Sequence, residues 1–494
     1  AACGTEPAGL AFGGLNTTPT KRGNTEEYNG SSTPDNIMTE ITVRYVDWIQ
    51  SFQMEASDDS SLVVFVPDLR VKNINTGEES YHIQTSVNNA GQSDTIVVSN
   101  GTYHENVVLN VQKITLRGPY ANKLNEDVII DAQDDGIAVL ISKAEIKLFG
   151  FNITGSFEEE DIFTSSGVKV LSNGNTIAYN KVSQSYAGIL LDDTDDNSVY
   201  ENTVDSVEYG IILTSSANNR IENNIILGVE ENDIELTDTG YSSGSSNNLI
   251  SGNHNIESLK FKNSEYNTIQ SQFVETINLQ NSDNNSAIGS EFDFVICNSA
   301  SSLYLKNYFN LNVTRENSPL EGVDLKVWDG DSVIYSTDYF GGNNDRTDSN
   351  GFITNILAIY KVYDGSSSGT DNTTNIKVRY GDWFISDNRV FDEQKTIRIE
   401  VPVFRIYNVD SGIGFSYVQS AIDNASAGDE IILSAGIFNE NIIIDKELTL
   451  SGTGTNTVFT VYPPFGMGSP PIADWTVAGI NVTAPDVTIS NLLV

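Results

Sequence analysis

The densest group of chemically active side chains in this sequence is an acidic run. It comprises Asp192, Asp193, Asp195 and Asp196. Hard cations such as Ca²⁺ bind several close oxygen ligands, and these carboxylates could supply them. The segments in the same place of the neighbouring repeats, 171–174 (LSNG) and 214–217 (TSSA), are typical of an external turn. We therefore predict solvated turn carboxylates here. Calcium at these four residues is the functional alternative, and calcium is the one cofactor that the sequence suggests.

A second oxygen-rich segment, 345–351 (DRTDSNG), places potential ligands at roughly alternating positions. It lacks the bidentate glutamate that completes a calcium loop, so we expect an ordinary Asp/Asn/Gly turn. The sequence shows no nucleophile triad, phosphate loop or zinc cluster. Its three histidines are His82, His104 and His254, and acid–base catalysis by them is not expected.

Residues 101–105 (GTYHE) resemble the opening G-x-Y-x-E motif of pectinesterases, and 293–296 (DFVI) loosely resemble their nucleophile segment. In that family one Asp attacks an ester, a second acts as acid and an Arg orients both. No matching acid or Arg follows Asp293 before residue 303. A polygalacturonase would need Gly-His-Gly and Arg-Ile-Lys motifs beside its clustered aspartates, and both are absent. We predict no catalytic residue and no enzyme activity.

Acceptor sequences for N-linked glycans recur along the chain, and the best candidates at exposed turns are Asn29, Asn284 and Asn372. The only cysteines are Cys3 and Cys297, which form neither a metal set nor a disulfide framework. Two isolated thiols are expected, with one long-range or interchain disulfide as the alternative.

Composition narrows the class of protein. The 494 residues carry 67 acidic and 27 basic side chains, for a net charge of -40. Such an acidic surface disfavours nucleic acid and anionic membranes and favours cations as partners. Hydrophobic residues make up 39%, which is too many for a disordered chain, yet no run is long enough to span a bilayer.

The chain repeats itself after about 335 residues. Residues 84–116 return as 419–450, and the motif YVDW at 45–48 returns as YGDW at 380–383. Two copies of one scaffold are unusual for an enzyme and common in fibres, lattices and stalks. In the second copy His104 is replaced by Asn439, whereas Glu105 returns as Glu440, so the repeat preserves a structural frame.

Residues 76–303 carry a shorter repeat, in which an Asn precedes a short apolar strand about every 18–29 residues. Its members are Asn175, Asn197, Asn219, Asn248 and Asn267. We predict about ten rungs, spaced ~4.8 Å apart, in which each Asn stacks on the Asn of the next rung. The pattern resembles the right-handed parallel β-helix of NosD-like and carbohydrate-binding or sugar-hydrolase proteins. Residues 406–494 are expected to start a second parallel β-helix, which is truncated.

The segment 304–405 resembles the carboxypeptidase-regulatory-like, collagen-adhesin-B-type family of immunoglobulin-like sandwiches. The resemblance rests on 318–327 (SPLEGVDLKV) and 347–352 (TDSNGF). It implies a spacer without catalysis. Residues 1–75 are expected to form a partial sandwich of the same kind, lacking two strands that a longer polypeptide or a neighbouring chain would supply.

The predicted fold is therefore all-β, with parallel β-helices alternating with immunoglobulin-like sandwiches. The pattern resembles that of repetitive surface proteins of archaea and bacteria, which implies an extracellular structural subunit of a filament, sheath or S-layer. Its partners would be copies of itself and N-linked glycans. The alternatives are a carbohydrate-binding or polysaccharide-degrading β-helix and a cell-surface adhesin. A carbohydrate-active protein would gather acids and aromatics on one face of the helix, whereas a lattice protein would scatter acids over its turns.

Overall fold

The computed structural model describes residues 38–55, 64, 66–120, 123–157, 161–238, 244–460 and 479–494. Cys3, Asn29 and the expected sandwich strands before residue 38 lie outside these ranges. Strands make up 52% of the structure and helices 4%, which confirms the all-β class. None of the helices in the described ranges has the length and apolar character needed to cross a bilayer. The chain comprises two compact units: residues 1–286, 290–303 and 364–367 form unit 1, and the remainder forms unit 2.

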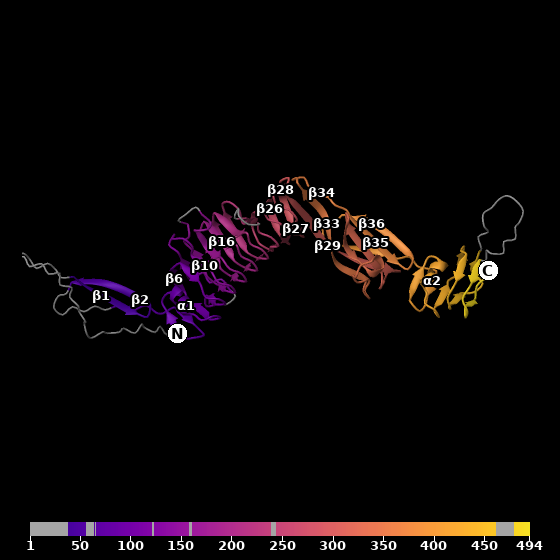
Figure 1. The fold of residues 1–494 in the computed structure, drawn as a ribbon, viewed down its shortest axis with the longest axis horizontal. Coiled ribbons are helices and arrows are strands. Elements are labelled where there is room, and N and C mark those ends of the chain that lie inside the picture. The colour runs from indigo at the N-terminus through magenta and orange to yellow at the C-terminus, as the bar shows by residue number, and fades with distance from the viewer. Residues whose placement is uncertain are drawn as a thin grey trace, which may run out of the picture. The chain divides into compact units, whose positions relative to one another are not determined.

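Unit 1 is a parallel β-helix built from three sheets (Figure 1). Sheet 1 contains, in spatial order, β7 (Val107–Leu109), β10 (Val139–Ile141), β13 (Ser166–Val170), β16 (Ala187–Asp192), β19 (Tyr209–Thr214), β22 (Ile234–Thr237), β24 (Ile256–Lys262), β26 (Phe273–Gln280) and β28 (Glu291–Cys297). Sheet 2 contains β5 (Thr95–Val98), β8 (Thr115–Arg117), β11 (Lys147–Phe149), β14 (Thr176–Ala178), β17 (Ser198–Tyr200), β20 (Arg220–Glu222), β23 (Leu249–Ser251), β25 (Thr268–Gln270) and β27 (Asn285–Ile288). Sheet 3 contains β6 (Gly101–His104), β9 (Val128–Asp131), β12 (Asn152–Thr154), β15 (Lys181–Ser183), β18 (Thr203–Val207) and β21 (Ile225–Val229).

The start of this β-helix is closed by antiparallel strands and a short helix. β3 (Val71–Asn73) pairs with β5 and with β4 (Glu79–Ser80), although the sequence placed residue 73 in the preceding module. Helix α1 (Ile83–Asn89) buries Ile83 and Val87 against these strands. Before them, β1 (Met38–Tyr45) and β2 (Trp48–Glu55) form a hairpin.

Two lines of buried amide side chains hold the rungs together. In the first line, the backbone N–H of Asn197 donates to the Oδ1 of Asn219 at 2.8 Å, and Asn219 repeats the bond to Asn248 at 2.8 Å. These residues lie at the corner between sheets 1 and 2, as the sequence predicted. A second line at the corner between sheets 2 and 3 was not predicted. It comprises Asn180, Asn202, Asn224, Asn253 and Gln272.

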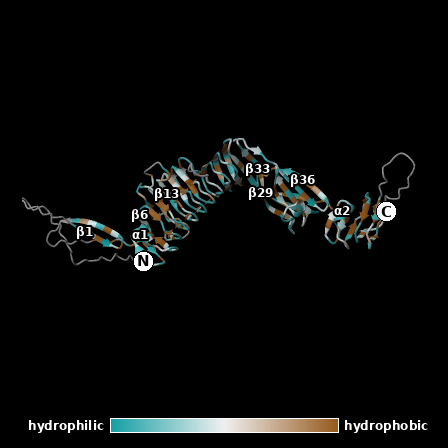
Figure 2. Cartoon of the chain, in the orientation of Figure 1, coloured by the Kyte–Doolittle hydropathy of each residue, from teal (hydrophilic) through white to brown (hydrophobic). Residues whose placement is uncertain are grey.

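Unit 2 opens with two sheets around one core. The first sheet contains β29 (Ser302–Arg315), β30 (Ser318–Pro319), β33 (Phe352–Asp364), β34 (Thr370–Asp371) and β37 (Lys395–Glu400). The second contains β31 (Asp324–Asp329), β32 (Ser332–Ser336), β35 (Thr374–Tyr380) and β36 (Trp383–Arg389). Buried residues alternate with partly exposed ones along β29 and β35, and hydrophobic and hydrophilic residues are intermingled over both sheets (Figure 2). The core includes Phe309 and Phe391, whose rings are stacked with their centres 4.1 Å apart. The immunoglobulin-like assignment stays a prediction.

The remainder of unit 2 starts a second β-helix that reproduces the first. It contains β38 (Ile406–Asn408), β39 (Ile413–Phe415), α2 (Val418–Asn424), β40 (Glu430–Leu433), β41 (Gly436–Phe438), β42 (Ile442–Ile444), β43 (Thr449–Gly452), β44 (Thr457–Phe459), β45 (Ile480–Val482) and β46 (Thr488–Ser490). β38 pairs with β39 and β40 as β3 pairs with β4 and β5, and α2 follows as α1 does. The long repeat in the sequence is therefore a repeat of structure.

Replacing Asn219 with Leu tests the amide line. The change removes the acceptor of Asn197 and the donor to the carbonyl of Thr194, leaving buried polar groups unpaired. Each such group costs about 1–3 kcal/mol, so chemical denaturation should show a loss of at least about 2 kcal/mol. Asn110→Leu is the control because Asn110 is exposed. Equal unfolding curves for the two variants would contradict this role.

Candidate functional site

Each β-helix begins at a connection that carboxylates hold together, and equivalent carboxylates occur in both copies. Asp47, in the turn of the β1–β2 hairpin, accepts the backbone N–H groups of Tyr81 and His82 at 2.7 and 2.9 Å. Asp382, in the turn of the β35–β36 hairpin, accepts those of Ser416 and Tyr417 at 2.6 and 3.0 Å. One carboxylate thus ties a hairpin turn to the residues that precede a helix in each copy.

A glutamate completes the start of the helix. Glu105 accepts the N–H groups of Ile83 and Gln84 at 2.8 and 2.9 Å, and Glu440 accepts those of Val418 and Gln419 at 2.9 and 3.1 Å. These N–H groups belong to the first turn of α1 or α2, where a helix leaves donors unsatisfied. The sequence showed that Glu105 returns as Glu440, and the structure gives the reason for it.

Backbone conformation also explains the paired glycines, because Gly101 and Gly436 have φ angles of +150° and +159°, which residues with a side chain rarely adopt. A Cβ at Gly101 would lie 2.5 Å from Nη1 of Arg70, and a Cβ at Gly436 would lie 2.8 Å from Nη1 of Arg405. The G-x-Y-x-E segment is therefore explained by structural contacts. His104 lies beside Asp131 at 3.1 Å, and Asp293 is exposed on β28.

The acidic run does not form one site in the structure. Asp192 pairs with Lys169 at 3.1 Å and accepts the hydroxyl of Thr214. Asp195 accepts the N–H of Ala217 at 2.7 Å, whereas Asp193 and Asp196 are exposed with left-handed backbone conformations. Within the described ranges no three His, Cys, Asp or Glu side chains are grouped to hold a metal ion. Calcium binding here stays a prediction.

The predicted turn at 345–351 closes on itself. Asp348 accepts the N–H groups of Asn350 and Phe352 at 2.9 and 2.8 Å, as in an ordinary Asp-initiated turn.

Of the glycosylation candidates, Asn284 and Asn372 are both half-buried, and the amide of Asn372 donates to the carbonyl of Ile359 at 2.9 Å. Cys297 is buried and forms no disulfide with any residue in the described ranges, and burial raises the pKa of its thiol.

A feature that the sequence analysis missed is a hollow on the outer face of sheet 1. Along β13, β16, β19 and β22 the outward side chains are buried as well as the inward ones. Leu190 and Ile212 form an external apolar cluster with Ile162. A cavity of about 290 Å³ lies beside this cluster. Its lining residues are Asp161, Ile162, Tyr186, Tyr209, Ile212, Glu235, Thr237 and Lys260.

Two aromatic rings lie side by side at this cavity. The rings of Tyr186 and Tyr209, on successive rungs, lie 5.6 Å apart in an edge-to-face arrangement, and Phe157 contacts Tyr186. Burial, together with the nearby Tyr186 and acidic side chains, raises the pKa of Tyr209 to about 12. The hydroxyl of Tyr209 therefore remains a protonated donor at neutral pH. The signal was present in the sequence, because YAGIL at 186–190 and YGIIL at 209–213 place a Tyr at or just before the start of two successive strands of sheet 1.

Two of the three charged residues that line the cavity, Glu235 and Lys260, are paired, and the third, Asp161, accepts the backbone N–H of Phe163 at 2.8 Å. Glu235 contacts Nζ of Lys260 at 3.0 Å and accepts the amide of Asn232 at 2.9 Å. Both carboxylate oxygens of Glu235 are therefore engaged. Aromatic surface beside fixed charged groups is an arrangement that can bind a polar ring compound.

Comparison with known proteins supports the β-helix assignment. Residues 161–344 match the family model described as periplasmic copper-binding protein (NosD). The chain is similar to alginate lyase from Paenibacillus sp. (14% identity, TM-score 0.34, covering 42% of this chain and 92% of that one). It is also similar to pectin methylesterase from carrot (11% identity, TM-score 0.27, covering 44% of this chain and 80% of that one). A third similar structure is the tailspike protein of E. coli bacteriophage HK620 (11% identity, TM-score 0.26, covering 59% of this chain and 73% of that one). TM-scores below 0.5 are too low for these structural likenesses to support a conclusion about this chain. A search of curated proteins found no match.

The matched residues do not fit a copper site. Copper is bound by imidazole, thiolate and thioether groups. Within 161–344 those groups are limited to His254 and Cys297. No metal-ligating cluster includes either residue in the described part of the chain. The family match therefore supports a NosD-like β-helix and gives no basis for copper chemistry here.

Acid should weaken the start of the first β-helix through Asp47. Burial raises the pKa of this carboxyl. The hydrogen bonds from the N–H groups of Tyr81 and His82 and from the Thr85 side chain lower the pKa by more than burial raises it, so the pKa lies below the ordinary 3.8. A lowered pKa stabilises the fold above pH 3.8 and loses that contribution as pH falls through the folded-state value. Amide exchange at Tyr81 and His82 should therefore accelerate below pH 4, relative to the intrinsic rate. In Asp47→Asn it should be fast at all pH values. A wild-type pH profile in this variant would contradict the assignment.

Proposed function

We propose that this chain is a structural segment of an extracellular cell-surface assembly, such as a filament, sheath or S-layer, and is not an enzyme. The observation that carries the proposal is the duplicated start of the β-helix. Asp47 and Glu105 make the same backbone contacts as Asp382 and Glu440, 335 positions further along. A connection reproduced bond for bond is expected where a module is used repeatedly as a building element.

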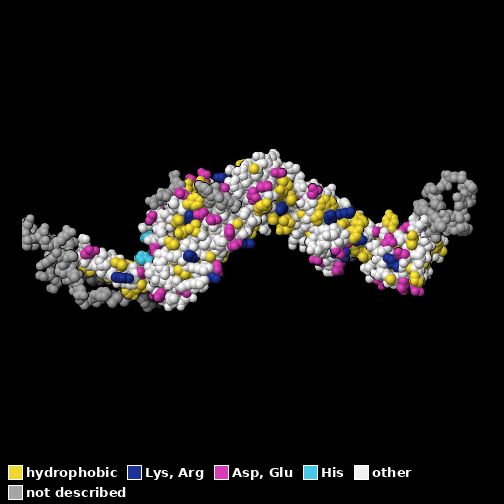
Figure 3. Space-filling model, in the orientation of Figure 1, with side chains coloured by type: hydrophobic (Ala, Val, Ile, Leu, Met, Phe, Trp, Pro, Cys, Tyr) yellow, Lys and Arg dark blue, Asp and Glu magenta, His cyan; other side chains and the backbone are white. Residues whose placement is uncertain are grey.

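The distribution of charge also supports assembly. Acidic side chains are spread over the visible surface, whereas Lys and Arg are few (Figure 3). Contacts between such surfaces need cations or local basic patches to offset repulsion. Copies of this chain are the proposed partners, with divalent cations such as Ca²⁺ bridging acidic turns and N-linked glycans covering exposed ones.

Self-assembly of the purified chain provides the test. At low ionic strength with millimolar Ca²⁺, sedimentation velocity and negative-stain microscopy should show ordered multimers that a chelator loosens. Multimers that are unchanged in chelator would contradict the calcium bridges alone. A chain that stays monomeric at every concentration and Ca²⁺ level would contradict the structural function.

The cavity on sheet 1 favours a second function, binding of a saccharide by the β-helix. Aromatic rings and fixed polar groups gathered on one face are what a carbohydrate-binding helix was expected to show, and Tyr186, Tyr209 and Glu235 provide them. A sugar ring could pack on exposed aromatic surface while its hydroxyls contact Glu235 and Lys260. Since Glu235 is paired, binding without turnover is proposed.

Tyr209→Ala tests this second function. Titration calorimetry against a panel of neutral and uronate oligosaccharides should give weak binding to the wild type and at least tenfold weaker binding to the variant. Tyr266→Ala, which changes an exposed Tyr on another turn of the same unit, is the control. Equal affinity of both variants, or no binding of any sugar to the wild type, would exclude this site. Product release abolished by Glu235→Gln would contradict binding without turnover.

A further inference from the structure

The outer face of the sheet formed by β31, β35 and β36 collects positive charge on a chain whose net charge is -40. We name this surface the basic face. Its cationic side chains are Lys326, Arg346, Lys377 and Arg379, and its carboxylates are Asp324 and Asp338. Figure 3 shows Lys and Arg side chains beside hydrophobic ones over β35 and β36. The basic face thus carries more cations than carboxylates.

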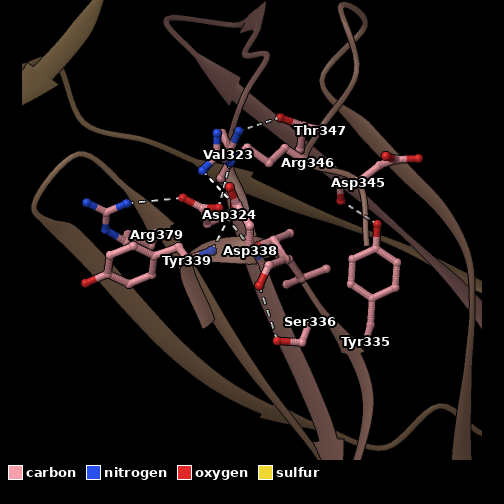
Figure 4. A network of polar contacts seen from close by, with 12 residues as sticks. Val323, Asp324, Tyr335, Ser336, Asp338, Tyr339, Asp345, Arg346, Thr347 and Arg379 are labelled. Carbon is pink, nitrogen blue, oxygen red and sulfur yellow. Dashed lines mark hydrogen bonds and ion pairs between the residues drawn. The ribbon is translucent and has the colours of Figure 1, made fainter. Parts of the chain in front are cut away.

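A buried carboxylate fixes the two arginines. Asp324 is 3% exposed and accepts Nε of Arg346 at 2.7 Å, Nη1 of Arg379 at 3.2 Å and the hydroxyl of Thr337 at 2.9 Å (Figure 4). Arg346 also pairs with Asp338 at 2.7 Å. Such charge-assisted bonds position guanidinium groups more firmly than exposed pairs do. The arginines are therefore structural supports of the face.

The two lysines lack such carboxylate partners. Lys326 on β31 lies directly opposite Lys377 on β35 in the antiparallel register. Like charges directly opposite on neighbouring strands are destabilising. Among the described residues neither lysine forms an ion pair. An anionic group from outside the chain would offset this repulsion.

Aromatic rings complete the basic face. The ammonium of Lys377 lies 5.0 Å from the ring centre of Phe384 and 5.9 Å from that of Phe340, and Lys326 lies 5.6 Å from that of Trp328. The guanidinium of Arg379 lies 3.5 Å from the ring centre of Tyr339. Tyr339 and Phe384 remain 48% and 42% exposed. Exposed aromatic residues and arginine are enriched at protein interfaces.

From this geometry we infer that the basic face docks the acidic surface of a second copy of this chain, through Lys326 and Lys377. A second copy fits because 67 acidic residues against 27 basic ones make acidic surface the commonest complement available in an assembly of this protein. The inference rests on the proposed structural function and names the contact surface within it. Charge complementarity of this kind sets orientation and association rate and weakens with salt.

The experiment compares self-association of the full chain and a double variant, Lys326→Glu with Lys377→Glu, by sedimentation velocity at 50 and 500 mM NaCl. The wild type should associate at low salt and dissociate at high salt. The double variant should associate at least tenfold more weakly. Lys361→Glu is the matched control, because Lys361 also lies near an aromatic ring, 5.5 Å from the ring centre of Tyr363, but on the other sheet of the same unit. This control variant should associate as the wild type does.

Two further variants protect the test against folding defects. Lys326→Gln with Lys377→Gln removes both charges without adding acids and should also associate weakly, while Lys326→Arg with Lys377→Arg should restore wild-type behaviour. Wild-type association by both the Glu and Gln variants would overturn the basic face and leave the structural function standing. A wild type that never associates would overturn both. Binding of free polygalacturonate at this face without self-association would also overturn the inference.

Discussion

In the first β-helix, the rungs from Ile146 to Asn267 each depend on a side-chain amide supplied by the next rung. The N–H of Asn197 at a corner has no backbone acceptor within its own rung and donates to Oδ1 of Asn219. Because Asn197 and Asn219 are fully buried, water cannot replace the bond. A rung is thus incomplete alone, and stacking is the way in which its polar groups are satisfied. The same constraint makes the module suited to repetition.

A related constraint applies to the first rung of the β-helix. A rung at the start has no preceding neighbour, so α1 and its carboxylate partner Glu105 supply the missing contacts. Asp47 then ties the preceding hairpin to this start. Since α2, Glu440 and Asp382 repeat the solution, the chain carries a standard connection between modules. Function in this account follows from repetition of connections, whereas the hollow on sheet 1 is a local addition to one face.

The sequence predicted the features that arise from a period. The line through Asn175, Asn197 and Asn219 was predicted because one residue type recurs before an apolar strand. The second line was missed, although Asn180 and Asn202 each follow the first-line Asn by five residues. The repeat of Glu105 as Glu440 was visible, but its role as acceptor of helix N–H groups needed coordinates.

Sites that arise from register could not be predicted in the same way. Lys326 and Lys377 are distant in sequence, and only the pairing of β31 with β35 places them opposite each other. The cavity at Tyr186 and Tyr209 likewise depends on residues 161 and 162, which come from another turn and cover the outer face of sheet 1. The four aspartates at 192–196 were predicted from proximity in sequence, and the structure gives Asp192 and Asp195 different partners.

Hydrogen exchange followed residue by residue tests the central claim most directly. The N–H groups of Asn175, Asn197, Asn219 and Asn248 each donate to a side chain of the next rung. The account predicts that they exchange as slowly as the flanking strand amides and lose protection together with them on unfolding. Rapid exchange at these corners, as in solvated turns, while the strands stay protected would contradict it.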